Sequence, residues 1–88
     1  MPYEIEFTKQ AMKDLKLLKT AGLLPKALAL LSTIQADPFV YPPSYEALGG
    51  DLKGKFSRRI NIQHRMVYAV DETRQVIDVL RMWSHYGE

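Results

Sequence analysis

Hydrophobic residues change their spacing twice along this 88-residue chain, and that change constrains the fold more than any other feature. Tyr3, Ile5 and Phe7 alternate with glutamates, which predicts a short strand with one solvated face. Residues 8–36 then carry apolar side chains at helical spacing, and strand-like patterns return from residue 56 onward. This order indicates an α+β domain whose helices pack on one face of a sheet.

The helical stretch contains signals for two helices. Thr8 is suited to cap the first helix, and Gly22 is suited to end it. Pro25 fits the first turn of a second helix, and Pro38 stops that helix. We therefore expect a helical hairpin over residues 8–36.

Residues 37–50 are rich in proline and glycine and predict a loop, which is long for so small a domain. Three strands should follow it as an antiparallel meander, joined by turns at residues 61–64 and 71–75. We expect these strands at Phe56–Ile60, at Arg65–Val70 and from Val76 to about Ser84. The pattern predicts a single domain over residues 1–88 and leaves open which strand the N-terminal strand joins.

Composition places the chain among globular proteins and excludes several classes. It has no cysteine, so disulfides and thiolate chemistry are excluded. No apolar run approaches the ~20 residues of a membrane span, and no signal peptide is visible at the N-terminus. We therefore expect a cytoplasmic protein with no membrane association.

The net charge is only +2, but basic residues gather in one block without an intervening acid. Such a block indicates an anionic partner, although a solvated basic strand gives the same pattern. We expect this block, together with Arg81, to contact the phosphate groups of the partner. Its members are Lys53, Lys55, Arg58, Arg59 and Arg65.

Strand alternation predicts which side chains share a face. Ser57 and Arg59 should point to one side of their strand, while one parity of the last strand unites Ile77, Val79, Arg81, Trp83 and His85. Arg59, Arg65 and Arg81 could meet across strands, at a cost unless a carboxylate or phosphate neutralises them. Arg81 could also pair with Asp78 or with an acid on the helices. His64 is expected as a solvated turn residue.

The chain has no metal-ligand spacing, phosphate loop, dinucleotide fingerprint or nucleophile elbow, so we expect no cofactor and no metal. Its polar residues fit metal-free cleavage of RNA, in which a base deprotonates the 2′-hydroxyl and an acid protonates the leaving oxygen. Glu46 could be the base and His85 the acid, with Arg59 and Arg65 stabilising the added negative charge.

Several blocks stand at compatible spacing in the second half of the chain: Glu46-Ala47-Leu48 with Leu52 and Gly54, residues 56–60, residues 64–70, Arg81 and His85-Tyr86. Together they resemble the YoeB/Txe branch of the RelE-like toxin superfamily. The resemblance covers residues 46–86 specifically and residues 1–40 in element order and length. Two positions depart from the family pattern: Gly49 stands where relatives often carry a lysine, and His85 follows Arg81 after a longer gap.

The resemblance implies a RelE-like microbial RNase fold and a ribosome-dependent mRNA endonuclease that cuts in the ribosomal A site. By position, Glu46 would be the general base and His85 the general acid. Arg65 would stabilise the transition state, Arg59 would help to hold phosphate, and Tyr86 would lie at the scissile nucleotide.

The resemblance also implies partners. A cognate Phd/YefM-like antitoxin would cover the basic site, and a homodimer could form within the toxin–antitoxin complex. Two alternatives remain open: a ParE-like toxin that binds DNA gyrase, and a degenerate toxin that serves only as an antitoxin partner. Both alternatives would leave the acid, base and arginines unused.

Overall fold

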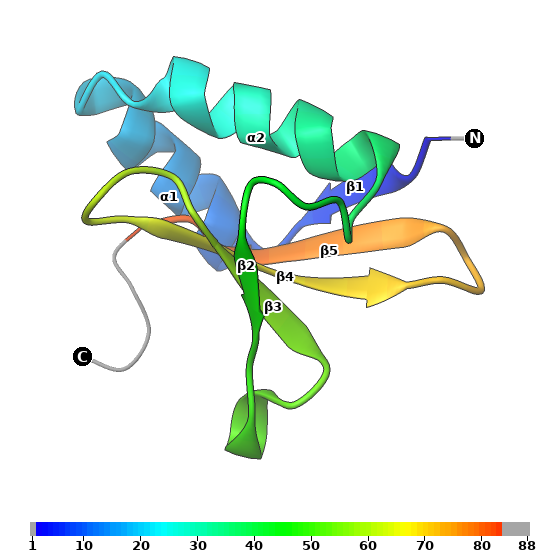
Figure 1. The fold of residues 1–88 in the computed structure, drawn as a ribbon. Coiled ribbons are helices and arrows are strands. Elements are labelled where there is room, and N and C mark those ends of the chain that lie inside the picture. The colour runs from blue at the N-terminus through cyan, green and yellow to red at the C-terminus, as the bar shows by residue number, and fades with distance from the viewer. Residues whose placement is uncertain (1, 84–88) are drawn as a thin grey trace.

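A computed structural model of the chain describes residues 2–83, in which two helices cover one face of a five-stranded sheet (Figure 1). This confirms the predicted α+β class. In chain order the elements are β1 (Glu4–Phe7), α1 (Lys9–Thr20), α2 (Leu24–Ala36), β2 (Tyr45–Ala47), the 3₁₀ turn η1 (Gly50–Leu52), β3 (Lys55–Arg59), β4 (Arg65–Asp71) and β5 (Val76–Arg81).

The strands lie in the order β1-β5-β4-β3-β2, and β3, β4 and β5 form the predicted antiparallel meander. The sequence left the neighbour of β1 open, and the structure places it parallel to β5, with Glu4 beside Val76. A parallel neighbour requires a crossover between the strands. The helical hairpin is the first part of that crossover, which explains why both helices lie on the same face (Figure 1).

The helix boundaries follow the signals in the sequence. The Thr8 hydroxyl accepts a hydrogen bond from the Ala11 backbone N–H at 3.1 Å, as an N-cap does. Gly22 follows α1 with a φ of 77°, a conformation that favours glycine. Pro25 lies in the first turn of α2. Neither helix of the described part is long and apolar enough to cross a membrane.

Apolar side chains from both helices and the sheet form one core. They are buried because each helix turns one stripe toward the strands, whose side chains alternate between the core and the opposite face. The core cluster consists of Ala11, Leu18, Ala27, Leu30, Leu31, Ile34, Ile60, Met66, Tyr68, Ile77, Val79 and Met82.

The predicted loop over residues 37–50 is partly wrong, because it contains β2 and the turn η1 begins at its end. Strand β2 pairs with β3, and Glu46 lies beside Ser57. Three residues are too few for a periodic pattern to be recognised in the sequence, and the pairing depends on partners 9 to 13 positions further along the chain. This hairpin extends away from the helices (Figure 1).

The last strand is shorter than predicted, because β5 ends at Arg81. Its register against β4 shifts between Val67 and Tyr68, so that Val67 faces Arg81 and Tyr68 faces Val79. This irregularity ends the simple alternation. Met82 therefore joins the core with Val79, so the predicted alternation does not continue unbroken after Val79. His85, which was predicted to share this parity, lies outside the described residues.

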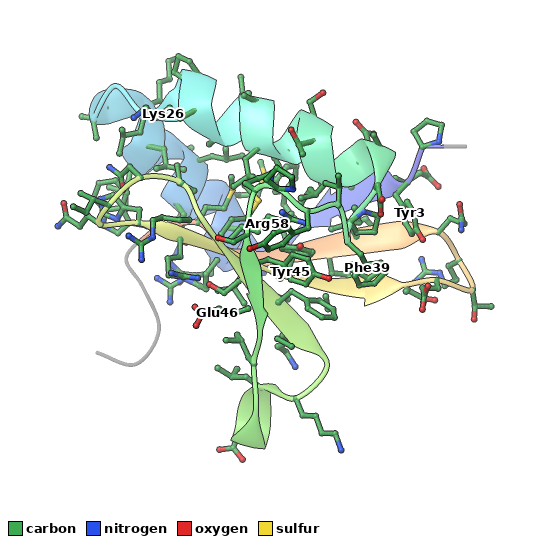
Figure 2. All side chains as sticks on the ribbon, in the orientation of Figure 1. Tyr3, Lys26, Phe39, Tyr45, Glu46 and Arg58 are labelled. Atoms are coloured by element: carbon green, nitrogen blue, oxygen red, sulfur yellow. The ribbon has the colours of Figure 1, made fainter. Side chains whose placement is uncertain are left out.

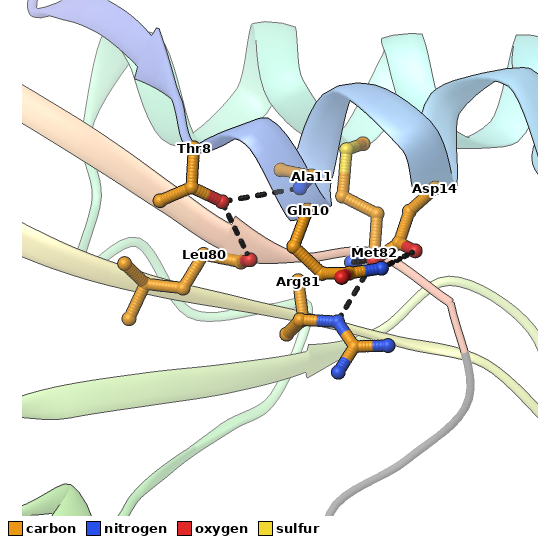
Figure 3. A network of polar contacts seen from close by, with 7 residues as sticks. All are labelled: Thr8, Gln10, Ala11, Asp14, Leu80, Arg81 and Met82. Atoms are coloured by element: carbon orange, nitrogen blue, oxygen red, sulfur yellow. Dashed lines mark hydrogen bonds and ion pairs between the residues drawn. The ribbon is translucent and has the colours of Figure 1, made fainter.

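Beyond the end of β1, residues of α1 and its N-cap form hydrogen bonds with polar groups at the end of β5 (Figure 3). The Thr8 hydroxyl donates to the Leu80 carbonyl at 2.9 Å. The Asp14 carboxylate, which is fully buried, accepts from Nε of Arg81 at 3.0 Å and from the Met82 backbone N–H at 2.9 Å. On the side where β1 has ended, the helix thus holds the end of β5, while β4 remains its neighbour on the other side.

Candidate active site on the open face of the sheet

The sheet face opposite the helices carries a group of polar side chains from β2, β3 and β4. Glu46 lies beside Ser57 in the register of β2 and β3. Arg59 lies beside Arg65 in the register of β3 and β4. Because directly paired residues share a face, the pairing gathers these side chains in one place. Figure 2 shows Glu46 pointing away from the helices.

Arg65 is held in a fixed orientation between two partners. Its Nη2 lies 2.6 Å from Oε1 of Glu46, and its Nε donates to the Ser57 hydroxyl at 2.6 Å. The side chain of Arg65 is only 18 % exposed, whereas that of Glu46 is 68 % exposed. The Arg65 guanidinium is therefore held against the sheet, whereas the Glu46 carboxylate can still accept hydrogen bonds from the solvent side.

Two adjoining hollows flank the Glu46–Arg65 ion pair. One encloses about 270 Å³ and the other about 250 Å³, and Arg59 lines both together with the ion pair. Two arginines and one accessible carboxylate thus face a space that could admit a phosphodiester and its flanking sugar. The remaining lining residues are Leu48, Ser57, Ile62 and Gln63 on one side and Ser44 and Tyr45 on the other.

The prediction that Arg58 binds phosphate is wrong. Arg58 is 0 % exposed and projects into the helix-covered side of the sheet. Its guanidinium donates to the Tyr68 hydroxyl and to the carbonyls of Pro38, Val40 and Pro43. The reason is strand alternation, since the residue between Ser57 and Arg59 must point to the other face.

The strand register brings together two of the three arginines that were expected to meet, and Arg81 does not line either hollow. Arg59 is paired with Arg65, and Arg81 faces Val67, two residues further along β4. Carboxylates offset the repulsion, as required: Glu46 pairs with Arg65, and Asp14 pairs with Arg81. The acid on a helix was one of the two partners considered for Arg81. A phosphate role for Arg81 stays a prediction.

The other predicted site residues are not all brought together. Lys53 follows η1, and Lys55 begins β3; neither lines the two hollows. Their phosphate contacts stay a prediction. His85 and Tyr86, the proposed acid and its neighbour, lie outside the described residues.

Sequence reasoning missed two polar residues that the fold uses. Ser57 fixes Arg65, and its shared parity with Arg59 was the available signal. Asp14 lies with Ala11 and Leu18 on the buried side of α1, and that spacing of three and four residues was the signal.

The prediction for His64 was also wrong. His64 is only 5 % exposed, and its ring stacks on Trp83 with 4.0 Å between ring centroids. The Trp83 ring, which follows the last strand, lies against the His64 ring and covers it, while Ile62 of the same turn stays 89 % exposed. A sequence cannot show which aromatic residue will pack against a turn 19 positions upstream.

Burial changes one ionisation equilibrium beside the site. Removal of Tyr68 from water raises its pKa, and the neighbouring Arg58 opposes part of this effect. Tyr68 is therefore a neutral hydroxyl that can accept from Arg58 and donate to the Pro38 carbonyl at 2.8 Å. Among the described residues, no group of three or more His, Asp or Glu side chains could hold a metal ion.

Solved structures with the same architecture are small bacterial toxins. The YoeB/ParE toxin from Agrobacterium tumefaciens superposes with a TM-score of 0.86 at 29 % identity, over 94 % of this chain and 99 % of that one. YoeB from the Staphylococcus aureus YoeB-YefM complex gives 0.80 at 31 % identity, over 98 % and 100 %. YafQ from Escherichia coli, at 17 % identity, shares the fold with a TM-score of 0.81. The fold and the basic open face therefore define a toxin of the class found in toxin–antitoxin systems.

Sequence comparison gives the family. Residues 7–86 match the family described as YoeB-like toxin of bacterial type II toxin-antitoxin systems. Toxin YoeB of Synechocystis sp. is 41 % identical over 73 residues, which is 83 % of this chain and 76 % of that protein. Toxin RelK of Mycobacterium tuberculosis is 39 % identical over 57 residues, 65 % of each chain. The chain belongs to the YoeB-like toxin family.

Proposed function

We propose that this toxin is an endoribonuclease that cleaves mRNA on the ribosome and thereby inhibits translation. The observation that carries the proposal is the contact of 2.6 Å between the exposed Glu46 carboxylate and the fixed Arg65 guanidinium, beside Arg59. A base next to cations is the arrangement that a reaction needs when it removes a proton and then accumulates negative charge on phosphorus.

The proposed reaction divides the chemistry among these side chains. Glu46 accepts the proton of the 2′-hydroxyl, and the 2′-oxygen forms a bond to the adjacent phosphorus. Arg65 and Arg59 stabilise the additional negative charge on the phosphoryl oxygens. The bond from phosphorus to the 5′-oxygen breaks, and His85 donates the proton that this oxygen takes up. Cleavage leaves a 2′,3′-cyclic phosphate and a 5′-hydroxyl, and it requires an RNA strand.

The assembly is proposed from relatives. YoeB of Staphylococcus aureus has been solved in a heterotetramer with YefM and also as a dimer. The YafQ toxin of Escherichia coli has been solved with DinJ. By analogy, a YefM-like antitoxin would bind this chain, occupy the basic face and block the access of RNA, and the toxin could form a homodimer. The toxin would act in the cytoplasm, where translating ribosomes are found.

Purified toxin, free of antitoxin, should be incubated with ribosomes carrying a defined mRNA, and the mRNA ends mapped by primer extension. We expect cleavage in the A-site codon, which Arg65→Ala and His85→Ala both abolish. No cleavage by the folded protein would contradict the proposal and would turn attention to gyrase binding. In cells, growth arrest that Glu46→Ala and His85→Ala relieve would separate a nuclease from a toxin that only binds.

A further inference from the structure

The guanidinium of Arg58 fastens the loop that leads into β2. Its Nε donates to the Tyr68 hydroxyl at 2.9 Å, and its Nη2 donates to the carbonyls of Pro38 at 3.1 Å and Val40 at 2.8 Å. Its Nη1 donates to the Pro43 carbonyl. Among the described residues Arg58 makes no ion pair, so neutral groups, these oxygens above all, offset the cost of burying its charge. Each contact therefore fixes a point of the loop.

Tyr68 completes the attachment from the neighbouring strand. It is 0 % exposed in the middle of β4, and its hydroxyl accepts from Arg58 and donates to the Pro38 carbonyl at 2.8 Å. Two paired strands, β3 and β4, thus hold the loop over residues 38–43. That loop leads directly into β2, since only Ser44 lies between Pro43 and Tyr45.

The same guanidinium also fixes the first residue of β2. Cζ of Arg58 lies 4.5 Å from the centre of the Tyr45 ring, and the two residues are register partners. The Tyr45 ring therefore lies on the core side of this edge strand, although the residue also borders one hollow, and the next residue, Glu46, points to the open face. Figure 2 shows the Tyr45 ring beside Arg58 and Glu46 directed away from both.

This arrangement matters because β2 has only three residues and is the edge of the sheet. A slip of one residue would turn Glu46 toward the core and bring Tyr45 to the open face. The Tyr45 ring also contacts the rings of Phe39 and Phe56. Arg58 adds polar contacts that attach both Tyr45 and the preceding loop to β3.

We propose that Arg58 and Tyr68 are positioning residues, which set the register of β2 and thereby hold the Glu46 carboxylate against Arg65. Neither residue touches the open face, so they act only through Glu46. The positioning is a property of the fold, whereas its effect on cleavage rests on the proposed ribonuclease function.

The test is Tyr68→Phe, which removes one hydroxyl from the attachment and leaves the ring in the core. The matched control is Tyr41→Phe, the same chemical change at a residue of the attached loop that is 72 % exposed. We expect Tyr68→Phe to lower kcat for ribosomal mRNA cleavage by about tenfold, because a slightly displaced base is a poor base. KM should change by less than about twofold, since the substitution leaves the positive charges of Arg59 and Arg65 in place.

A double-mutant comparison distinguishes positioning from a general loss of structure. In a Glu46→Gln background, Tyr68→Phe should cause no further loss of kcat, because the base on which it acts is already absent. An equal loss in both backgrounds, or a wild-type kcat for Tyr68→Phe, would overturn the proposal. The rates are compared at a temperature where circular dichroism shows every variant to be folded.

A second readout does not require activity. The NMR signal of the Arg65 Nη2 hydrogens reports the contact with Glu46, because Nη2 donates to the Glu46 carboxylate. Glu46→Gln gives the position of that signal without the ion pair. Tyr68→Phe should move the signal toward that position, whereas Tyr41→Phe should not. If the wild-type protein does not cleave mRNA, the proposed function fails and this shift alone decides the positioning. An unmoved signal would refute the positioning.

Discussion

Asp14 of α1 and Arg81 of β5 form an ion pair with an N–O distance of 3.0 Å, although 67 residues separate them in the sequence. The same carboxylate oxygen accepts the backbone N–H of Met82. Because the Asp14 side chain is only 1 % exposed, these donors take the place of water around its carboxylate, and the carboxylate in turn is their hydrogen-bond acceptor. This contact attaches the last strand, and the chain that continues from it, to the first helix.

Replacing Asp14 by alanine should destabilise the protein strongly. The substitution leaves the Met82 N–H and the partly buried Arg81 without their acceptor, at a cost of about 2–3 kcal/mol in the free energy of unfolding. Urea denaturation followed by circular dichroism measures the change. Lys13→Ala, one position earlier on the exposed side of α1, should alter stability by less than about 0.5 kcal/mol. Equal effects of both substitutions would show that the buried contact contributes little.

The Thr8 hydroxyl makes two structural hydrogen bonds, and removing it should lower the stability of the protein through the loss of both. The hydroxyl caps α1 through Ala11 and donates to the Leu80 carbonyl of β5. Thr8→Ala should therefore lower the free energy of unfolding by about 1–2 kcal/mol. Thr20→Ala removes only an exposed bond to Lys16 within the helix and serves as the control. A thermal shift for Thr8→Ala no larger than that for Thr20→Ala would contradict the dual role.

Stability should fall at alkaline pH because of Tyr68. Burial raises the pKa of Tyr68 in the folded state above the ordinary value of 10.0. As pH rises past about 10, the unfolded chain loses this proton while the folded chain retains it, so ionisation favours unfolding. The urea midpoint of the wild type should drop more steeply between pH 9 and 11 than that of Tyr68→Phe. Parallel pH profiles of the two proteins would exclude Tyr68 as a cause.

The predictions from sequence succeeded where the signal is local. Thr8, Gly22 and Pro25 each act through their own turn, and all three mark helix ends as expected. The meander was also predictable, because β4 and β5 each contain enough apolar residues to show their type. These signals need no knowledge of distant partners.

The failures share a dependence on tertiary contacts. Strand β2 exists only because it pairs with β3, and Arg58 is buried only because three carbonyls of a distant loop accept from it. The register shift beside Val67 determines where Arg81 points, and no pattern within β5 announces it. In the site, the resemblance indicated Glu46 and Arg65 as functional residues. Their pairing follows from the registers of β2 with β3 and of β3 with β4, which the sequence does not show.

Lysine should not replace Arg65. The arginine uses Nε for Ser57 and Nη2 for Glu46, two contacts from one planar group, and a lysine ammonium cannot reproduce this fork. We expect Arg65→Lys to lower the rate of ribosomal mRNA cleavage by about 10²–10³-fold while the protein stays folded. Arg74→Lys is the control, because Arg74 is 62 % exposed and makes only long contacts to Glu6 and Asp71. The measurement is the single-turnover cleavage rate. If the rate of Arg65→Lys lies within about threefold of the wild-type rate, this guanidinium does not stabilise the transition state.

Arg59 offers a way to separate substrate binding from catalysis. It is exposed, lines both hollows and makes no ion pair among the residues that the structure describes, so its charge is available to a phosphate. Arg59→Ala should weaken the binding of toxin to programmed ribosomes and reduce the slope of log K against log salt concentration by about one. Binding is best measured with a Glu46→Gln toxin, which leaves the mRNA intact. Arg74→Ala, a charge change away from the hollows, should leave the slope unchanged, and an equal change for both variants would mean that only net charge matters.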